Sequence, residues 1–155
     1  MSLNLRKYLS VVILAMGIAF VSTSLASADA PLTKCNIRID DPHLSTSLRK
    51  SEGIIAVKVN ARSKCDKPMW DLVLRVEIFK VGLFRDYLVG QYDLKIKGYI
   101  AKNKEVKNQE TFAECKSRKL SRFYGKAIAT ATVDGKSMRT WPLLTEKTVT
   151  LPCGT

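Results

Sequence analysis

The chain has 155 residues, of which 46% are hydrophobic and 26% are charged, and its formal net charge is +12. This composition excludes collagen-like, repetitive and low-complexity proteins, and the length fits one folded domain. The charge favours contact with polyanions, although lysine and arginine on a solvated sheet face also raise solubility without any partner.

Residues 1–28 have the pattern of a secretory signal peptide. A short basic region at Arg6 and Lys7 precedes an apolar run over residues 9–21, and small residues up to Ala28 supply a cleavage site. The pattern predicts export and cleavage after Ala28.

The mature protein is therefore expected to be residues 29–155, a single domain that is secreted and is either extracellular or associated with the cell envelope. It retains 24 basic and 14 acidic residues. No other window approaches the roughly 20 consecutive apolar residues that a membrane-spanning helix needs, so we do not expect an integral membrane protein.

Alternation of apolar and polar residues with period two predicts short β-strands along the mature chain. The pattern covers residues 33–39, 53–62, 70–79 and 88–97, and each stretch is expected to form one strand. The alternation is strongest over 70–79. No window of the mature chain shows the apolar stripe and paired caps of an amphipathic helix.

The same alternation continues in the last third of the chain. Apolar and small residues share one face over 123–133, and Asp134-Gly135 then predicts a tight turn into a returning strand. Pro142 is expected to interrupt the pairing of that strand, and residues 147–153 form a final strand that closes the domain.

About seven short strands in one domain predict an all-β fold, a β-sandwich of two antiparallel sheets with an immunoglobulin-like architecture. A small β-barrel is the alternative. The likeness to immunoglobulin domains is architectural only, because Ala113 stands where their tyrosine precedes the second cysteine. Trp70 and Trp141 are expected to fill the core, where tryptophan usually packs.

The mature chain carries four cysteines, an even number that predicts two disulfides in an oxidising compartment. Three pairings are possible. We favour Cys35 with Cys65 and Cys115 with Cys153, because strands that follow one another in sequence tend to be neighbours in space. Consecutive cysteines are at least 30 positions apart. Zinc sites and redox motifs pair cysteines roughly two to four positions apart, so no metal site is expected.

The order of these motifs resembles a group of small secreted actinobacterial proteins. The shared features are a first cysteine, an Asp-Pro-His-x-Ser run at 41–45, a second cysteine before a strand that begins at Trp70, and a cysteine near the C-terminus. The resemblance implies a secreted protein with two disulfides in an immunoglobulin-like sandwich, and it implies no activity. The lysine richness of this chain is not part of the shared pattern.

The sequence contains a single histidine, and histidine-dependent catalysis would have to use it with neighbouring aspartates and serines. Members of a catalytic triad usually come from separated elements that converge, whereas these residues are adjacent. We interpret the stretch as a turn in which aspartates accept backbone hydrogen bonds. Because common catalytic and cofactor-binding motifs are also missing from the sequence, we expect neither an enzyme nor a cofactor. The residues concerned are Asp40, Asp41, His43, Ser45 and Ser47.

Two segments concentrate positive charge and are the candidate polyanion-binding sites. The first spans 13 residues with a single acid, Glu105, and the second spans seven residues without an acid. Tyr99 lies in the first segment, and Phe123 and Tyr124 border the second, an interleaving typical of single-strand nucleic-acid binders. No recognition-module signature accompanies it, so no specific nucleic acid is expected. The first basic cluster is Lys95, Lys97, Lys102, Lys104 and Lys107, and the second basic cluster is Lys116, Arg118, Lys119 and Arg122.

Our leading hypothesis is that the protein acts by surface contact with an anionic envelope polymer or with lipid headgroups, through the two basic clusters. The alternative is a secreted inhibitor of an extracellular hydrolase, in which a disulfide-braced loop fills the cleft of the enzyme. Residues 62–69 and 116–122 are the candidate inhibitory segments, because each contains or adjoins a cysteine and carries lysine or arginine that a trypsin-like pocket accepts.

Overall fold

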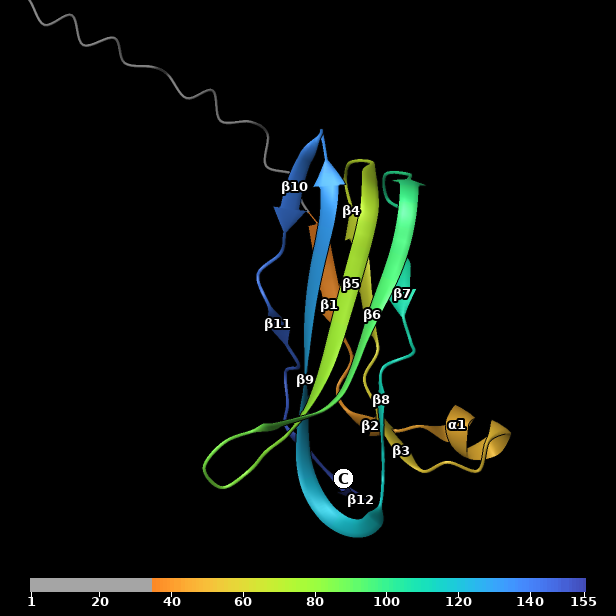
Figure 1. Ribbon diagram of the computed structural model, residues 1–155, viewed down its shortest axis with the longest axis vertical. Helices are drawn as coiled ribbons and strands as arrows, with labels where there is room; N and C mark the ends of the chain where they lie inside the picture. Colours follow the sequence, from red (N-terminus) through yellow and green to blue (C-terminus); the bar gives the residue numbers. More distant parts are fainter. Residues whose placement is uncertain (1–34) are drawn as a thin grey trace, which may run out of the picture. The chain divides into compact units, whose positions relative to one another are not determined.

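The computed structural model describes residues 35–155, and Figure 1 shows them as strands with a short helix. The predicted signal peptide and its cleavage site lie outside the described residues. Within 35–155 the fold is all-β, as expected. Its elements are, in chain order, β1 (Cys35–Ile39), β2 (His43–Leu44), α1 (Thr46–Ser51), β3 (Ala56–Lys58), β4 (Ala61–Cys65), β5 (Met69–Lys80), β6 (Tyr87–Ile100), β7 (Val106–Asn108), β8 (Phe112–Glu114), β9 (Ser117–Val133), β10 (Lys136–Arg139), β11 (Leu143–Leu144) and β12 (Val149–Gly154).

The largest sheet has the strand order β10-β9-β5-β6, and β11 and β12 also pair with β9. All of these pairings are antiparallel. The strand β9 has 17 residues. Its first part, up to Phe123, pairs with β12, and its remaining length pairs with β5. Phe123 and Ala127, on the face predicted to be buried, are fully enclosed. This sheet forms one layer of the sandwich.

The second layer consists of two three-stranded sheets, β1-β4-β7 and β2-β3-β8. The prediction of one strand over 53–62 is wrong, because the chain passes from β3 to β4, which belongs to the other small sheet. Val59 and Asn60 make the crossing, and their backbones are hydrogen-bonded to Thr111 and Asp40. Val59 is fully buried, so the alternation of burial continues through the break and conceals it in the sequence.

Two hydrophobic clusters fill the space between the layers. The inward side chains of β5 supply both clusters, with Val76 and Ile78 in the one that contains β3 residues and Leu72 and Leu74 in the other. All four side chains are at most 1% exposed. Burying such side chains contributes roughly 1.5–3 kcal/mol each relative to exposure. The alternation over 70–79 thus predicted both the strand and the core positions from Leu72 onward.

Neither tryptophan fills the core as predicted. Trp70 is 38% exposed, and its ring meets the Tyr99 ring edge-on at 5.3 Å between centroids. The cause is an irregularity after Trp70, where Asp71 has a φ of 53° and the pairing with β6 slips, so Trp70 leaves the inward face that Leu72 occupies. Trp141 is 91% exposed, because it lies in the segment between β10 and β11, outside the paired strands.

The favoured disulfide pairing is confirmed. Cys35 bonds to Cys65, which lies opposite it across β1 and β4. Cys115 bonds to Cys153. Cys115 directly follows β8, and Cys153 lies in β12. Cys153 is fully buried and belongs to the hydrophobic core. The second disulfide therefore holds β12 beside the first residues of β9.

The turn predicted at Asp134-Gly135 is confirmed, with a positive φ at both residues and β10 returning along β9. The prediction of a chain without helix is wrong over Thr46–Ser51, which form α1. Ser45 caps this helix by accepting a hydrogen bond from the Leu48 amide at 3.3 Å. Six residues are too few to show an apolar stripe, which is why the sequence pattern does not reveal the helix.

Candidate functional site

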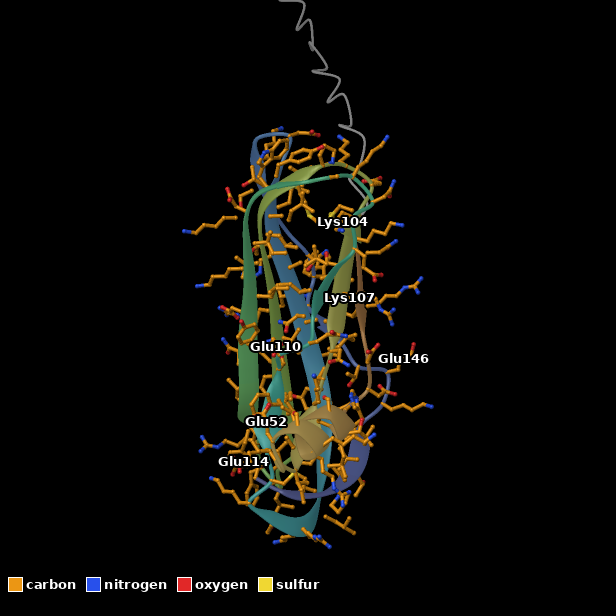
Figure 2. The ribbon with its side chains drawn as sticks, turned by 90° about the vertical axis from the view of Figure 1, so that its right-hand side faces the viewer. Glu52, Lys104, Lys107, Glu110, Glu114 and Glu146 are labelled. Carbon is orange, nitrogen blue, oxygen red and sulfur yellow. A yellow bond between two sulfur atoms is a disulfide. The ribbon has the colours of Figure 1, made fainter. Side chains whose placement is uncertain are left out.

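The first basic cluster lies along one edge of the sandwich, toward the upper end of β6 in Figure 1. Two of its lysines are exposed on β6, two lie in the exposed loop that follows, and Lys107 is on β7. Figure 2 shows Lys104 and Lys107 on this edge. Lys107 forms an ion pair with Glu105 at 3.2 Å, so one charge of the cluster is already compensated.

The second basic cluster lies at the opposite end of the large sheet, where β9 begins (Figure 1). All four side chains are exposed. Lys116 precedes the strand, and the other three are in the part of β9 that runs along β12. Within residues 35–155, no acidic side chain forms an ion pair with any of the four. The second cluster is therefore less compensated than the first.

The two clusters do not form one surface. Lys95 pairs with Val73, which pairs on its other side with Thr130. The first cluster is therefore level with the end of β9. Measured along this strand, the path from Lys119 to Thr130 is about 35 Å at roughly 3.3 Å per residue. The clusters are two separate candidate contacts, one at each end of the sheet.

The aromatic residues beside the clusters are arranged for packing. Phe123 is fully buried, and Tyr124 is half-buried and stacked on Phe79 at 5.1 Å between ring centroids. The exposed Tyr99 ring lies against Trp70. Base stacking requires an exposed aromatic face, and the two residues that border the second cluster do not offer one.

The hairpin between β5 and β6 places two exposed apolar side chains near the second basic cluster. Leu83 is 89% exposed and Phe84 is 94% exposed. The hairpin leaves the sheet beside Arg122, whose carbonyl oxygen accepts a hydrogen bond from the Val81 amide at 2.8 Å. Figure 1 shows the loop projecting sideways from the lower part of the large sheet. These residues were not among the predicted site residues. The signal in the sequence was two adjacent large apolar residues between two predicted strands.

Three contacts hold this hairpin in shape. The Gly82 amide donates to one carboxylate oxygen of Asp86 at 3.3 Å, and the Tyr124 hydroxyl donates to the other at 3.0 Å. Burial and this hydrogen bond raise the pKa of Tyr124 above its usual value. The Arg85 guanidinium lies 5.3 Å from the centroid of the Tyr87 ring. A Cβ at Gly82 would overlap the Arg85 carbonyl oxygen, so the turn requires glycine there.

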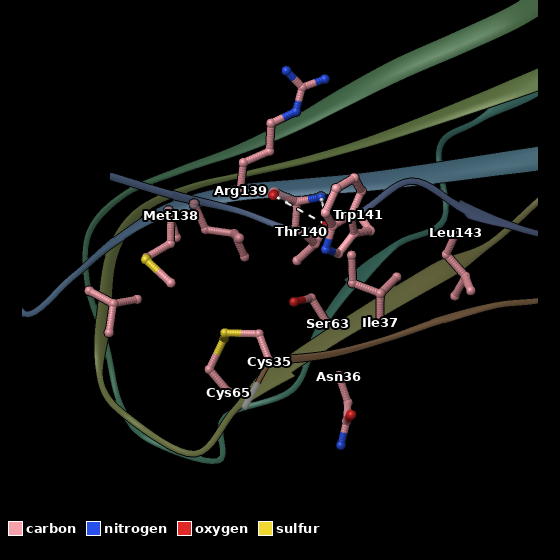
Figure 3. Close-up of a pocket in the computed structure, with 14 residues that line it drawn as sticks. Cys35, Asn36, Ile37, Ser63, Cys65, Met138, Arg139, Thr140, Trp141 and Leu143 are labelled. Carbon is pink, nitrogen blue, oxygen red and sulfur yellow. Dashed lines mark hydrogen bonds between the residues drawn. A yellow bond between two sulfur atoms is a disulfide. The ribbon is translucent and has the colours of Figure 1, made fainter. Parts of the chain in front are cut away.

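An apolar groove of about 380 Å³ lies between β1 and the segment that includes β10 and β11. Figure 3 shows Met138 and Trp141 on one side of it and the Cys35–Cys65 disulfide on the other. The Ser63 hydroxyl points into this space, is buried and has no hydrogen-bond partner within residues 35–155. The described residues that line the groove include no acid and no histidine. The groove therefore offers apolar contact with a few polar groups, from Asn36, Ser63, Arg139 and Thr140, rather than acid–base chemistry.

The hydrogen bonds around His43 are those of a structural turn. The ring of His43 is exposed, and its Nδ1 lies 3.0 Å from the Asp41 carbonyl oxygen. Ser45 Oγ caps α1 and lies 3.1 Å from Ser47 Oγ. The Asp41 carboxylate accepts a backbone hydrogen bond, as the turn interpretation predicts, but the donor is the amide of Lys147, far along the chain.

The two candidate inhibitory segments lie mostly in paired strands. Residues 62–65 belong to β4, which pairs with β1 and β7, and residues 117–122 belong to β9, which pairs there with β12. An inhibitor that fills a cleft presents an exposed loop, and in 62–69 only residues 66–68 lie between strands. The geometry of these segments gives the inhibitor hypothesis little support.

Among the described residues, no three His, Cys, Asp or Glu side chains gather as a metal site requires. In the same part of the chain, none of the helical structure has the length and apolarity to cross a bilayer. No family model matches the chain, and no curated protein matches it. The likeness to small secreted actinobacterial proteins stays an expectation from the sequence, and a proposal of function has to rest on the geometry described above.

Proposed function

We propose that the protein is a non-catalytic exported domain that binds an anionic surface of the cell envelope through the second basic cluster. The observation that carries this proposal is the group of four exposed cations at the start of β9, for which residues 35–155 supply no ion-pair partner. Uncompensated positive charges this close together attract phosphate and carboxylate groups.

The backbone that carries the second cluster is held firmly. β12 pairs with this part of β9, and the Cys115–Cys153 disulfide ties the two segments together. The Lys116 amide also donates to the Gly154 carbonyl oxygen at 2.7 Å. Because the backbone is already ordered, the four charges keep their spacing, and binding costs little backbone entropy.

Export is part of this proposal. Its support is the signal-peptide pattern of residues 1–28 and the presence of two disulfides, which persist in oxidising compartments. Mass spectrometry of the native protein tests it. We expect a chain that starts at Asp29 with both disulfides formed, and a cytosolic product with four free thiols would contradict the proposal.

Retention on an immobilised polyanion tests the binding itself. We expect retention at low salt and elution by about 0.5 M salt, where the screening length falls to about 4 Å. Arg118→Gln combined with Lys119→Gln is expected to lower the salt concentration of elution. Lys102→Gln combined with Lys104→Gln is the matched control, because it removes the same charge at the other end of the sheet and is expected to have a much smaller effect. Salt-independent retention, or equal effects of the two double variants, would contradict the proposal.

A further inference from the structure

We infer that the hairpin between β5 and β6 inserts Leu83 and Phe84 into the interfacial region of an anionic lipid bilayer. This inference rests on the proposed function and identifies its anionic surface as a lipid membrane. Both side chains are almost fully exposed, at 89% and 94%, and they are adjacent at the tip of a loop that projects from the sheet (Figure 1). Exposed apolar groups that project together mark a surface that contacts another apolar phase.

Two cations, Arg85 and Arg122, lie close to this apolar tip. Arg85 is in the loop itself, and Arg122 lies beside Val81, whose amide donates to the Arg122 carbonyl oxygen at 2.8 Å. The rest of the second basic cluster precedes Arg122 on the same strand, and Leu120 among these cations is 66% exposed. An apolar tip with cations beside it matches an anionic interface, in which acyl chains lie beneath a layer of phosphate groups.

The one acid of the hairpin is exposed but hydrogen-bonded within the protein. Both carboxylate oxygens of Asp86 accept hydrogen bonds, one from the Gly82 amide and one from the Tyr124 hydroxyl. These bonds satisfy the carboxylate and at the same time close the loop. The tip is therefore presented in a fixed shape, so little conformational entropy is lost when it inserts.

The apolar tip distinguishes a membrane from a soluble polyanion. A polymer such as polyphosphate would engage the cations and leave Leu83 and Phe84 in water. A bilayer engages the same cations and also removes both side chains from water, which is favourable in proportion to the apolar area buried. Tip variants that keep every charge therefore separate the two kinds of partner.

The experiment uses the disulfide-intact mature protein and vesicles of phosphatidylcholine with and without phosphatidylglycerol. Leu83→Ser combined with Phe84→Ser is expected to lower partitioning onto the anionic vesicles about tenfold or more, because both buried apolar side chains are lost. Trp141→Ser is the matched control, since Trp141 is also 91% exposed but lies away from the hairpin. We expect this control to partition like the original protein.

A spectroscopic variant reports insertion directly. With Trp70→Phe and Trp141→Phe in place, Phe84→Trp puts a single indole at the tip, and its emission is expected to shift to shorter wavelength on anionic vesicles but not on soluble polyphosphate. Unshifted emission, or unchanged partitioning of the serine double variant, would overturn the inference. If binding to anionic vesicles and to polyphosphate still depended on salt, the proposed function would remain. Loss of salt-dependent binding to vesicles and polyphosphate alike would remove the proposed function itself. Thermal unfolding of each variant checks that it is folded.

Discussion

Arg75 donates two parallel hydrogen bonds of 2.8 Å to the carboxylate of Asp93, which lies directly opposite it across β5 and β6. A guanidinium and a carboxylate in this bidentate arrangement attract each other more strongly than a single hydrogen bond would allow. The hydrogen bond from Arg75 lowers the pKa of Asp93 below its ordinary value of 3.8. The pair thus helps to fix the register of β6, the strand into which the hairpin leads.

Asp93→Asn is expected to lower the free energy of unfolding at neutral pH and to have little effect in strong acid. Since the pKa of Asp93 is lower in the folded state than in the unfolded state, the ionised pair stabilises the fold above the ordinary pKa. That stabilisation is lost as the pH falls through the folded-state pKa. Denaturant unfolding of both proteins at about pH 7 and about pH 2 measures the difference. An equal effect at the two pH values would show that the ion pair is not its source.

Asn108→Ala is expected to lower the free energy of unfolding by about 3 kcal/mol, because it removes the hydrogen bonds that a buried amide makes with three backbone groups. Asn108 is fully buried. Its amide nitrogen donates to the carbonyl oxygens of Leu74 at 2.9 Å and Tyr92 at 3.1 Å, and its side-chain oxygen accepts from the Glu110 amide at 3.2 Å. Urea unfolding checks the value, with the exposed Gln109→Ala as a control that should change little. A loss as small as that of the control would contradict this role.

Replacing both cysteines of one disulfide by alanine is expected to cost about 4 kcal/mol, since the loops span 30 and 38 positions. In a domain of this size the melting temperature should fall by about 10–20 °C. The two double variants should differ in binding. Loss of Cys115–Cys153 frees the backbone of the second basic cluster and should weaken polyanion retention, whereas loss of Cys35–Cys65 should not. Calorimetry and salt elution measure the two effects, and identical elution of the two variants would argue against the bracing role.

Ser63→Ala is expected to leave the free energy of unfolding unchanged or to raise it by up to about 1 kcal/mol, because the hydroxyl is buried without a protein partner. The substitution also removes one polar group from the lining of the groove. Urea unfolding is the measurement. A clear loss of stability would show that a partner such as an ordered water satisfies the hydroxyl, and the groove would then have to be treated as a hydrated site.

The fold could be predicted from the sequence where burial follows a simple period of two. Leu72, Leu74, Val76 and Ile78 occupy every second position, and the structure buries all four. The prediction fails where the backbone departs from a regular strand while the side-chain pattern does not. At Asp71 a positive φ shifts the phase and turns Trp70 outward. At Asn60 the chain changes sheets while burial keeps its alternation, and hydrophobicity alone does not record which partner a strand has.

The candidate site could be predicted only in part. Local charge density identifies both basic clusters, because it is a property of neighbouring residues in the sequence. Their separation was not predictable, because it depends on how β5 aligns β6 with β9, a long-range register. Leu83 and Phe84 were missed because an apolar pair between two strands resembles a continuation of either strand. The last pair between β5 and β6 is Lys80 with Tyr87. This register, which the sequence does not record, leaves Leu83 and Phe84 in the loop outside the sheet.

The position of β6 at the end of the large sheet bears on self-assembly. Within this sheet β6 pairs on one side only, with β5, and terminal strands of this kind can pair with a strand of a second molecule. Lys95 and Lys97 project from that edge strand, and Gly98, with a φ of 83°, breaks its regular path. Another copy docking there through its own β6 would set lysine against lysine. We expect this repulsion to oppose edge-to-edge association of concentrated protein, an effect that needs no ligand.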